Sequence, residues 1–204
     1  DPLRLADLVA YDSLTPGMAE ILQGLGKAKI NILISGGTGS GKTTMLNVIS
    51  GFIGATERIV TVEDAAELQL QQPHVVRMES RPGGFEGAGV VSIRDLLRNS
   101  LRMRPDRIVV GECRGGEIVD LLRALNSGHR GGMTTLHANQ VTAVPSRLVA
   151  LGLLSGLNPQ ATAALAQDAF DVVLHVGRVG GRRGREFGRI RRLSGHRLPR
   201  GLRR

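Results

Sequence analysis

The chain has 204 residues, a formal net charge of +9 and a hydrophobic share of 41%. This length suits one domain, and the apolar content excludes a disordered chain. No run approaches the roughly 20 apolar residues that a membrane-spanning helix needs. The single cysteine, Cys113, excludes an internal disulfide and a four-cysteine zinc site. Because the chain begins with Asp1 and shows no leader, we expect a fragment of a longer protein without a targeting signal.

The positive charge is concentrated at the C-terminal end. Residues 178–204 contain eleven arginines and one acid, whereas residues 1–177 contain 16 basic and 17 acidic residues. The larger part therefore gives no electrostatic reason to expect a specific nucleic acid partner. We expect the last residues to form a solvated tail. A weak contact of this basic tail with an anionic membrane, or with an acidic partner, is the alternative.

Strands and helices are expected to alternate along the chain. Residues 1–29 have the spacing of a helical lead-in, with a helix start at Thr15-Pro16, and the apolar residues 30–34 predict a buried strand. Further strands are expected at 58–62, 75–78, 107–110 and 132–136, and helices at 42–52, 92–103, 117–126, 141–151 and 159–169. Residues 80–90 form a Gly-rich loop, and 172–176 with 187–193 predict a hairpin around Gly180-Gly181.

Strands that are apolar on both faces and alternate with helices indicate an α/β fold with a mostly parallel central sheet. We expect three parts: a helical lead-in or linker remnant at 1–29, the main domain at 30–178, and a basic hairpin with a flexible tail at 179–204.

A phosphate-binding loop is the strongest motif in the sequence. The stretch matches G-x-x-x-x-G-K-[ST] between an expected strand and an expected helix. Its glycines let backbone N–H groups turn toward phosphate oxygens, and the helix start adds its dipole. Lys42 would contact the β- and γ-phosphates, and the Thr43 hydroxyl would bind Mg²⁺. The predicted nucleotide-binding residues are Gly36, Gly37, Thr38, Gly39, Ser40, Gly41, Lys42, Thr43 and Thr44.

Acidic residues and a histidine follow three of the expected strands. Glu63-Asp64 and Glu112 come where ligands bind in an open α/β sheet, so they are candidates to orient an attacking water. His137 ends another strand and could sense the γ-phosphate or position water. A solvated loop is the alternative for each acid, and a structural role is the alternative for His137.

Arginines could complete such a site. Arg77 and Arg81, beside the Gly-rich loop, are the preferred candidates to reach a neighbouring subunit, where an arginine can stabilise phosphoryl transfer. Arg98, Arg102, Arg104, Arg107 and Arg114 surround the Glu112 strand. We expect most arginines to be solvated or to form structural salt bridges.

Together these motifs resemble the secretion ATPase superfamily, the hexameric motors of type II secretion, type IV secretion and pilus assembly. The resemblance covers residues 5–193, including the segments 36–44, 58–68, 101–107, 111–115 and 134–139. It is greatest for the CpaF-type ATPases of tight-adherence (Flp) pili, and the single cysteine separates the chain from the branch with a four-cysteine zinc module.

The resemblance implies a RecA-like P-loop domain that hydrolyses ATP with Mg²⁺. It implies that 36–44 form the Walker A loop, that Glu63 and Asp64 belong to the Asp box, with Glu63 polarising the attacking water, and that Glu112 is the Walker B carboxylate. It also implies that His137 is the His-box residue and that Arg77 and Arg81 act across a subunit interface.

The resemblance further implies a homo-hexamer in the cytoplasm, associated peripherally with the inner membrane, that moves a membrane platform protein. Two features depart from the usual pattern. Gly111 stands where Walker B motifs usually carry Asp, which leaves Thr43 as the predicted protein ligand for the metal. The N-terminal domain of the family is not evident, and we expect full activity to require it.

Two alternatives remain. One is a DNA-transfer type IV secretion ATPase or a RecA-like DNA motor, although the chain has few aromatic residues on which bases could stack. The other is a non-hydrolysing module that uses nucleotide to gate assembly. The joint presence of Glu63, Glu112 and His137 argues against it.

Overall fold

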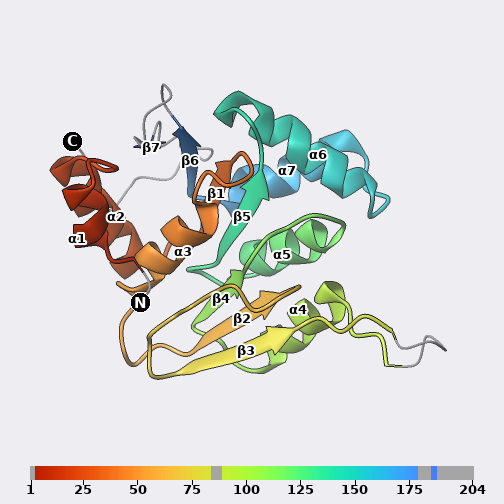
Figure 1. Cartoon of the computed structure of the whole chain (residues 1–204). Helices are drawn as coiled ribbons and strands as arrows, with labels where there is room; N and C mark the ends of the chain where they lie inside the picture. The colour runs from red at the N-terminus through yellow and green to blue at the C-terminus, as the bar shows by residue number, and fades with distance from the viewer. Residues whose placement is uncertain (1–2, 84–88, 179–184, 188–204) are drawn as a thin grey trace.

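A seven-stranded sheet forms the centre of the protein, in the order β3-β2-β4-β5-β1-β6-β7 (Figure 1). The computed structural model describes residues 3–83, 89–178 and 185–187. Strands β1 to β6 are parallel to their neighbours, and β7 pairs antiparallel with β6. The strands are β1 (Ile32–Gly36), β2 (Ile59–Glu63), β3 (Val75–Glu79), β4 (Arg107–Val110), β5 (Met133–His137), β6 (Val172–Arg178) and β7 (Arg185–Phe187).

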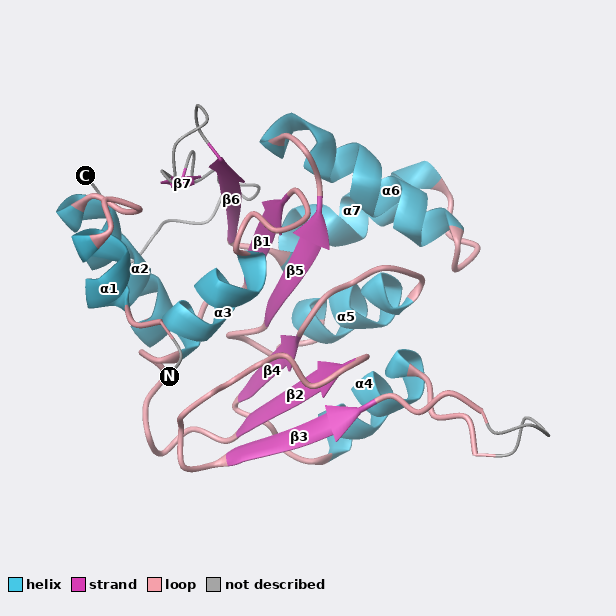
Figure 2. Cartoon of the chain, viewed as in Figure 1, coloured by secondary structure: helices cyan, strands magenta, loops and turns pink. Residues whose placement is uncertain are grey.

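Helices cover both faces of this sheet (Figure 2). One layer contains α1 (Leu5–Ala10), α2 (Pro16–Lys27) and α3 (Lys42–Ser50). The other contains α4 (Ile93–Arg102), α5 (Glu117–Asn126), α6 (Val144–Leu153) and α7 (Pro159–Ala169), with a short 3₁₀ turn η1 (Val141–Ala143) before α6. The predicted α/β architecture with a mostly parallel sheet is therefore confirmed.

Two hydrophobic cores follow from the two helical layers. On β1, the side chains of Ile32 and Ile34 pack with α1 to α3, whereas Leu33 packs with the layer of α4 to α7. All five residues of β1 are buried, because a strand in the middle of a sheet covered on both sides has no solvated face. This explains why the sequence of β1 is a continuous apolar run.

Three helices begin where the sequence places a capping residue. The side chains of Thr15, Ser92 and Asn158 each accept a hydrogen bond from the backbone N–H three residues later. These bonds satisfy donors that a helix start leaves free. The helix expected at 141–151 is divided into η1 and α6. Pro145 lies in the first turn of α6, where a residue without an N–H is tolerated because no hydrogen bond to the preceding turn is needed there.

The described residues contain the expected pairing of the terminal hairpin. Strand β6 agrees with the expected 172–176 and extends to Arg178. Its partner β7 covers Arg185–Phe187, so among the described residues it shares Phe187 with the predicted strand 187–193. Val176 pairs with Phe187, the facing ends of the two expected strands, and the pairing continues toward the turn through Gly177 with Glu186 and Arg178 with Arg185. Residues 188–193 and the basic tail lie outside the described part of the chain.

No helix among the described residues is long and apolar enough to cross a membrane. The division of the chain into a lead-in, a main domain and a basic end stays a prediction. The structure does show that α1 and α2 share a hydrophobic core with α3 and the sheet.

A buried arginine joins α2 to the amino end of the sheet. The side chain of Arg107, at the start of β4, is 1% exposed and binds both carboxylate oxygens of Glu57, with Nε–Oε2 and Nη2–Oε1 distances of 2.7 and 3.0 Å. It also donates to the main-chain carbonyls of Gly26 and Ala28 at the end of α2. Arg107 therefore has the structural role that the sequence suggested for most arginines.

Replacing Arg107 by Ala would leave the partly buried Glu57 carboxylate and two carbonyls without this partner. We expect the free energy of unfolding to fall by about 3 kcal/mol, as when one member of a buried ion pair is removed. Urea unfolding followed by circular dichroism measures the change. Arg123→Ala, at an exposed position on α5, is the control and should stay within about 0.5 kcal/mol of the parent. Equal stability of the Arg107 and Arg123 variants would contradict the role of Arg107.

Candidate active site

The carboxyl ends of β1, β2, β4 and β5 lie at the same edge of the sheet, where they enclose a small cleft together with the segments that follow β1, β2 and β4. Its volume is about 100 Å³. The lining residues are Lys42 and Thr43 at the start of α3, Glu63, Asp64, Ala65 and Glu67 at and after the end of β2, Gly111, Glu112 and Arg114 after β4, and Thr135 within β5. The structure thus brings together the phosphate loop and the two predicted carboxylates, which are separated by up to 70 residues in the sequence.

The phosphate loop connects β1 to α3. Gly41 precedes the helix with a φ angle of +101°, a left-handed conformation that suits glycine. Lys42 Nζ donates to the main-chain oxygen of Gly37 at 3.0 Å, and the hydroxyl of Ser40 is buried without a hydrogen-bond partner. Lys42 Nζ could therefore exchange its hydrogen bond to Gly37 for one to a phosphate oxygen, and the Ser40 hydroxyl could donate to another phosphate oxygen.

The charge on Lys42 is affected by its neighbours in the cleft. Partial burial lowers the pKa of Lys42, the Glu112 carboxylate raises it, and the Arg114 guanidinium lowers it. Lys42, Glu112 and Arg114 therefore lie close enough to influence one another electrically. Such a group of charges at a loop that binds phosphate is typical of a nucleotide site.

Glu63 is held in place at the end of β2. Its residue exposure is 4%, and its Oε1 accepts hydrogen bonds from the backbone N–H groups of Glu67 and Leu68 at 3.1 and 2.9 Å. Burial raises the pKa of Glu63, the two hydrogen bonds lower it, and the nearby charges of Glu67 and Glu79 raise it, with a net upward shift. A fixed carboxylate with a raised pKa is suited to accept a proton from water.

Gly111 has no side chain, and this leaves room for the side chain of Glu63. A Cβ atom at Gly111 would lie 3.0 Å from Cγ of Glu63 and 3.3 Å from its Oε1. Contacts this short require one of the groups to move. The glycine at the position where Walker B motifs usually carry Asp therefore makes room for a carboxylate that comes from the neighbouring strand.

Glu112 lies beside Gly111 and forms an ion pair within the cleft. Both Nε and Nη2 of Arg114 lie 2.7 Å from Glu112 Oε2. On the other side, the Thr135 hydroxyl of β5 donates to the main-chain oxygen of Gly111 at 2.7 Å and so joins the ends of β4 and β5. Thr135 was not among the predicted site residues, although it lies within the segment 134–139 that carries the family resemblance, and this was the available signal.

Asp64 and His137 lie at the margins of this arrangement. Asp64 lines the cleft and accepts a hydrogen bond from the Ser80 hydroxyl at 3.0 Å. His137 pairs in register with Gly36, the first residue of the phosphate loop, and the next residue, Ala138, donates its N–H to the Gly36 carbonyl. The structure thus places His137 beside the loop, but His137 is not among the residues that line the cleft.

Arg77 and Arg81 do not line the cleft of their own subunit. Arg77 lies on the edge strand β3 and donates to the carbonyl of Leu70, and Arg81 donates through Nε to the carbonyl of Gly89. Both side chains are exposed. Their suggested action on a neighbouring subunit stays a prediction.

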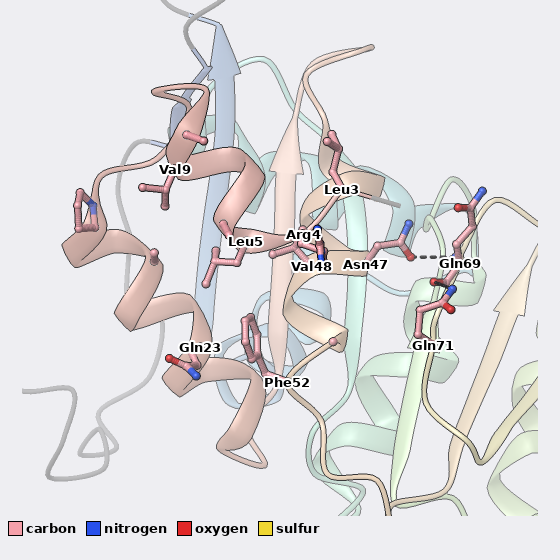
Figure 3. A pocket seen from close by; sticks show the side chains of 15 residues that line it. Leu3, Arg4, Leu5, Val9, Gln23, Asn47, Val48, Phe52, Gln69 and Gln71 are labelled. Atoms are coloured by element: carbon pink, nitrogen blue, oxygen red, sulfur yellow. Dashed lines mark hydrogen bonds between the residues drawn. The ribbon is translucent and has the colours of Figure 1, made fainter. Parts of the chain in front are cut away.

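A larger hollow lies elsewhere, between the lead-in helices and α3 (Figure 3). It has a volume of about 800 Å³ and is lined mainly by apolar groups such as Leu5, Val9 and Phe52. Its polar rim includes Asn47, whose Oδ1 accepts a hydrogen bond from the backbone of Gln69. Among its lining residues Arg4 carries the positive charge, so this hollow lacks the phosphate-binding groups of the smaller cleft.

Comparison with known proteins agrees with this site. The profile of the type II/IV secretion system protein family matches residues 1–175. A putative conjugal transfer protein of Mycobacterium tuberculosis is 48% identical over 193 residues, which cover 94% of this chain and 55% of that protein. The chain spans about half the length of such curated relatives.

Solved structures show the same relationship. The VirB11 ATPase of the Brucella suis type IV secretion system, solved with sulphate, is 30% identical with a TM-score of 0.77, covering 92% of this chain and 54% of that one. The pilus retraction motor PilT with bound ADP is 28% identical with a TM-score of 0.68, covering 91% and 51%. A phosphate loop in a parallel sheet, with acidic residues at the adjoining strand ends, defines a P-loop NTPase of RecA-like architecture. The chain belongs to the type II/IV secretion system protein family.

Replacing Glu63 by Gln should stabilise the fold while reducing any catalysis that needs the carboxylate. The folded state raises the pKa of Glu63, so at neutral pH its charge opposes folding, and Gln keeps an oxygen for both backbone donors. We expect Tm to rise by roughly 2–4 °C at pH 7, the change that about 1 kcal/mol produces in a domain of this size.

The difference in Tm between the two proteins should shrink as the pH falls, since protonation of Glu63 then removes the same charge from the parent. Thermal unfolding between pH 5 and 8 measures this trend. Glu20→Gln, on the exposed face of α2, is the control with the same chemical change. A Tm for Glu63→Gln that is lower than the parent value at pH 7 would contradict the argument.

Proposed function

We propose that this chain is the ATP-hydrolysing domain of a motor that powers pilus assembly or secretion across the bacterial envelope. The observation that carries the proposal is the cleft in which Lys42 and Thr43 meet Glu63 and Glu112. Phosphate-binding groups alone would support nucleotide binding. Two carboxylates in the same cleft add the means to orient water and accept its proton.

The residues of the phosphate loop fit a nucleotide. Lys42 and the backbone of 36–44 would hold the phosphates, and the unpartnered Ser40 hydroxyl is available beside them. The Thr43 hydroxyl and the nearby carboxylates offer the oxygen ligands that Mg²⁺ prefers, with Thr43 as the direct ligand. When bound, Mg²⁺ would neutralise charge on the β- and γ-phosphates. The sulphate in the VirB11 structure and the ADP in the PilT structure support this assignment.

Glu63 and Glu112 would have different roles in hydrolysis. Glu63 is fixed by two backbone N–H groups and has a raised pKa, which favours a role in polarising the attacking water. Glu112 would act as the Walker B carboxylate. His137, in register with the first glycine of the phosphate loop, would sense the γ-phosphate or position water.

We further propose a cytoplasmic homo-hexamer, bound peripherally at the inner membrane, that moves a platform protein of the envelope machine. Arg77 and Arg81, exposed and outside the cleft of their own subunit, would act on the nucleotide of a neighbour. The membership of this chain in the type II/IV secretion system protein family supports the proposal that it works in an envelope machine. Assignment to the CpaF-type branch and contact of the basic tail with anionic lipid also stay proposals.

A DNA-transfer ATPase is the second candidate. The names of relatives support it, since the protein of Mycobacterium tuberculosis and the TrbB protein of Rhizobium radiobacter are described as conjugal transfer proteins. ATPase activity that single-stranded DNA stimulates, with a steep decrease in DNA affinity as salt rises, would favour this candidate. Activity that is indifferent to DNA would favour the pilus or protein-secretion machine.

Two substitutions separate nucleotide binding from turnover. Lys42→Ala should abolish measurable ATP binding, because it removes the point charge at the phosphates. Glu112→Gln should retain binding within a few-fold but reduce turnover by at least about 100-fold. Binding is measured by calorimetry and turnover by phosphate release. Lys27→Ala and Glu20→Gln, both exposed on α2, are the matched controls. Wild-type turnover in Glu112→Gln would reject the role of Glu112.

If sites are completed between subunits, the specific ATPase rate should depend on protein concentration. We expect the rate per subunit to rise several-fold as subunits associate, and Arg77→Ala or Arg81→Ala to reduce the plateau, because a trans arginine can contribute ~10³–10⁵ in rate. Phosphate release across a dilution series measures this, with light scattering to follow assembly. A rate per subunit that is constant from monomer to oligomer would contradict completion in trans.

A further inference from the structure

Arg114 is the unexplained cation of the cleft. Among the described lining residues, Lys42 and Arg114 carry positive charge, whereas Glu63, Asp64, Glu67 and Glu112 are acidic. A nucleoside triphosphate would bring about four further negative charges to this space. Lys42 and a Mg²⁺ ion that accompanies the nucleotide would neutralise only part of this negative charge, so a second cationic side chain that can reach the phosphates would lower the electrostatic cost of binding.

The present contact of Arg114 is of a kind that can be exchanged. Both Nε and Nη2 approach the same oxygen of Glu112, Oε2, instead of pairing with the two carboxylate oxygens separately. The Arg114 side chain is 67% exposed, and exposed ion pairs contribute little to stability. The guanidinium can therefore leave Glu112 at small cost when a stronger anion arrives.

A terminal phosphate is such an anion. Guanidinium groups match phosphate oxygens with paired, charge-assisted hydrogen bonds that are stronger than neutral ones. Arg114 lies close enough to Lys42 for its charge to lower the pKa of that lysine, which is the residue expected at the β- and γ-phosphates. Arg114 also lines the same small cleft as Lys42 and Thr43, so its guanidinium lies in the space that the end of a triphosphate would enter.

We propose that Arg114 binds the terminal phosphate of a nucleoside triphosphate, and that it rests on Glu112 until the nucleotide enters. Moving the guanidinium to the phosphate releases Oε2 of Glu112. The site then distinguishes triphosphate from diphosphate through one side chain of its own subunit. The inference rests on the proposed nucleotide-binding function of the same cleft.

The test compares two ligands in one protein. The affinities of the non-hydrolysable β,γ-imido analogue of ATP and of ADP are measured by calorimetry with Mg²⁺. Arg114→Ala should weaken binding of the triphosphate analogue about tenfold and change ADP binding less than threefold, so that kcat/KM for ATP falls mainly through KM. Arg114→Lys, which retains the charge without the planar fork, should recover part of the loss. Arg123→Ala, an exposed arginine on α5, should bind both ligands like the parent.

A double-mutant cycle with Glu112→Gln tests the resting contact. When Arg114 is present, Glu112→Gln should strengthen binding of the triphosphate analogue by a few-fold, because it weakens the pair that holds the guanidinium. In the Arg114→Ala background the same change should have a smaller effect. An equal effect in both backgrounds would show only the removal of a negative charge and would overturn the proposed exchange.

Equal losses for ATP analogue and ADP in Arg114→Ala, or no loss for either, would also overturn the inference and would indicate a fixed brace on Glu112. These results leave the proposed function intact, provided that the parent protein binds both nucleotides. If the parent binds neither, the proposed function fails and the inference fails with it. Unchanged circular dichroism of Arg114→Ala ensures that a loss of affinity is not a loss of fold.

Discussion

The parallel pairing of β2, β4, β5 and β1 is the constraint on which the rest of the structure depends. Parallel strands that lie side by side must end at the same edge of the sheet, so their following loops share one space. The phosphate loop, Glu63 and Glu112 meet there for this reason. The pairing is maintained by two apolar cores, one on each face, and by Arg107, which joins the amino end of β4 to α2.

The cleft combines opposite electrostatic requirements in a small volume. The proposed function requires carboxylates for chemistry on water and cations for phosphates. Glu63 satisfies the first requirement while buried, since two backbone N–H groups support its oxygen and Gly111 gives it room. Cation and acid also meet in the pair of Arg114 and Glu112. A raised pKa at Glu63 is a cost in stability that functional sites commonly carry.

Much of the fold could be predicted because its local signals agree with one another. The apolar run of β1, the caps Thr15, Ser92 and Asn158, and the glycines of the phosphate loop each specify backbone conformation through neighbouring residues alone. The extent of the terminal hairpin was less predictable. Val176 pairs with Phe187, as the expected strands 172–176 and 187–193 imply, but the pairing continues to Arg178 and Arg185, and turn residues alone do not determine how far two strands stay paired toward the turn.

The sequence by itself determined the phosphate loop and the order of strands and helices, because these depend on spacing along the chain. It also indicated which acids follow strand ends. Only the tertiary structure decided that Gly111 makes space for Glu63, that Arg107 is buried in an ion pair with Glu57, and that Arg114 forms an ion pair with Glu112. These are contacts between side chains whose distance and burial depend on how neighbouring strands and loops pack, and residue types alone do not specify that packing.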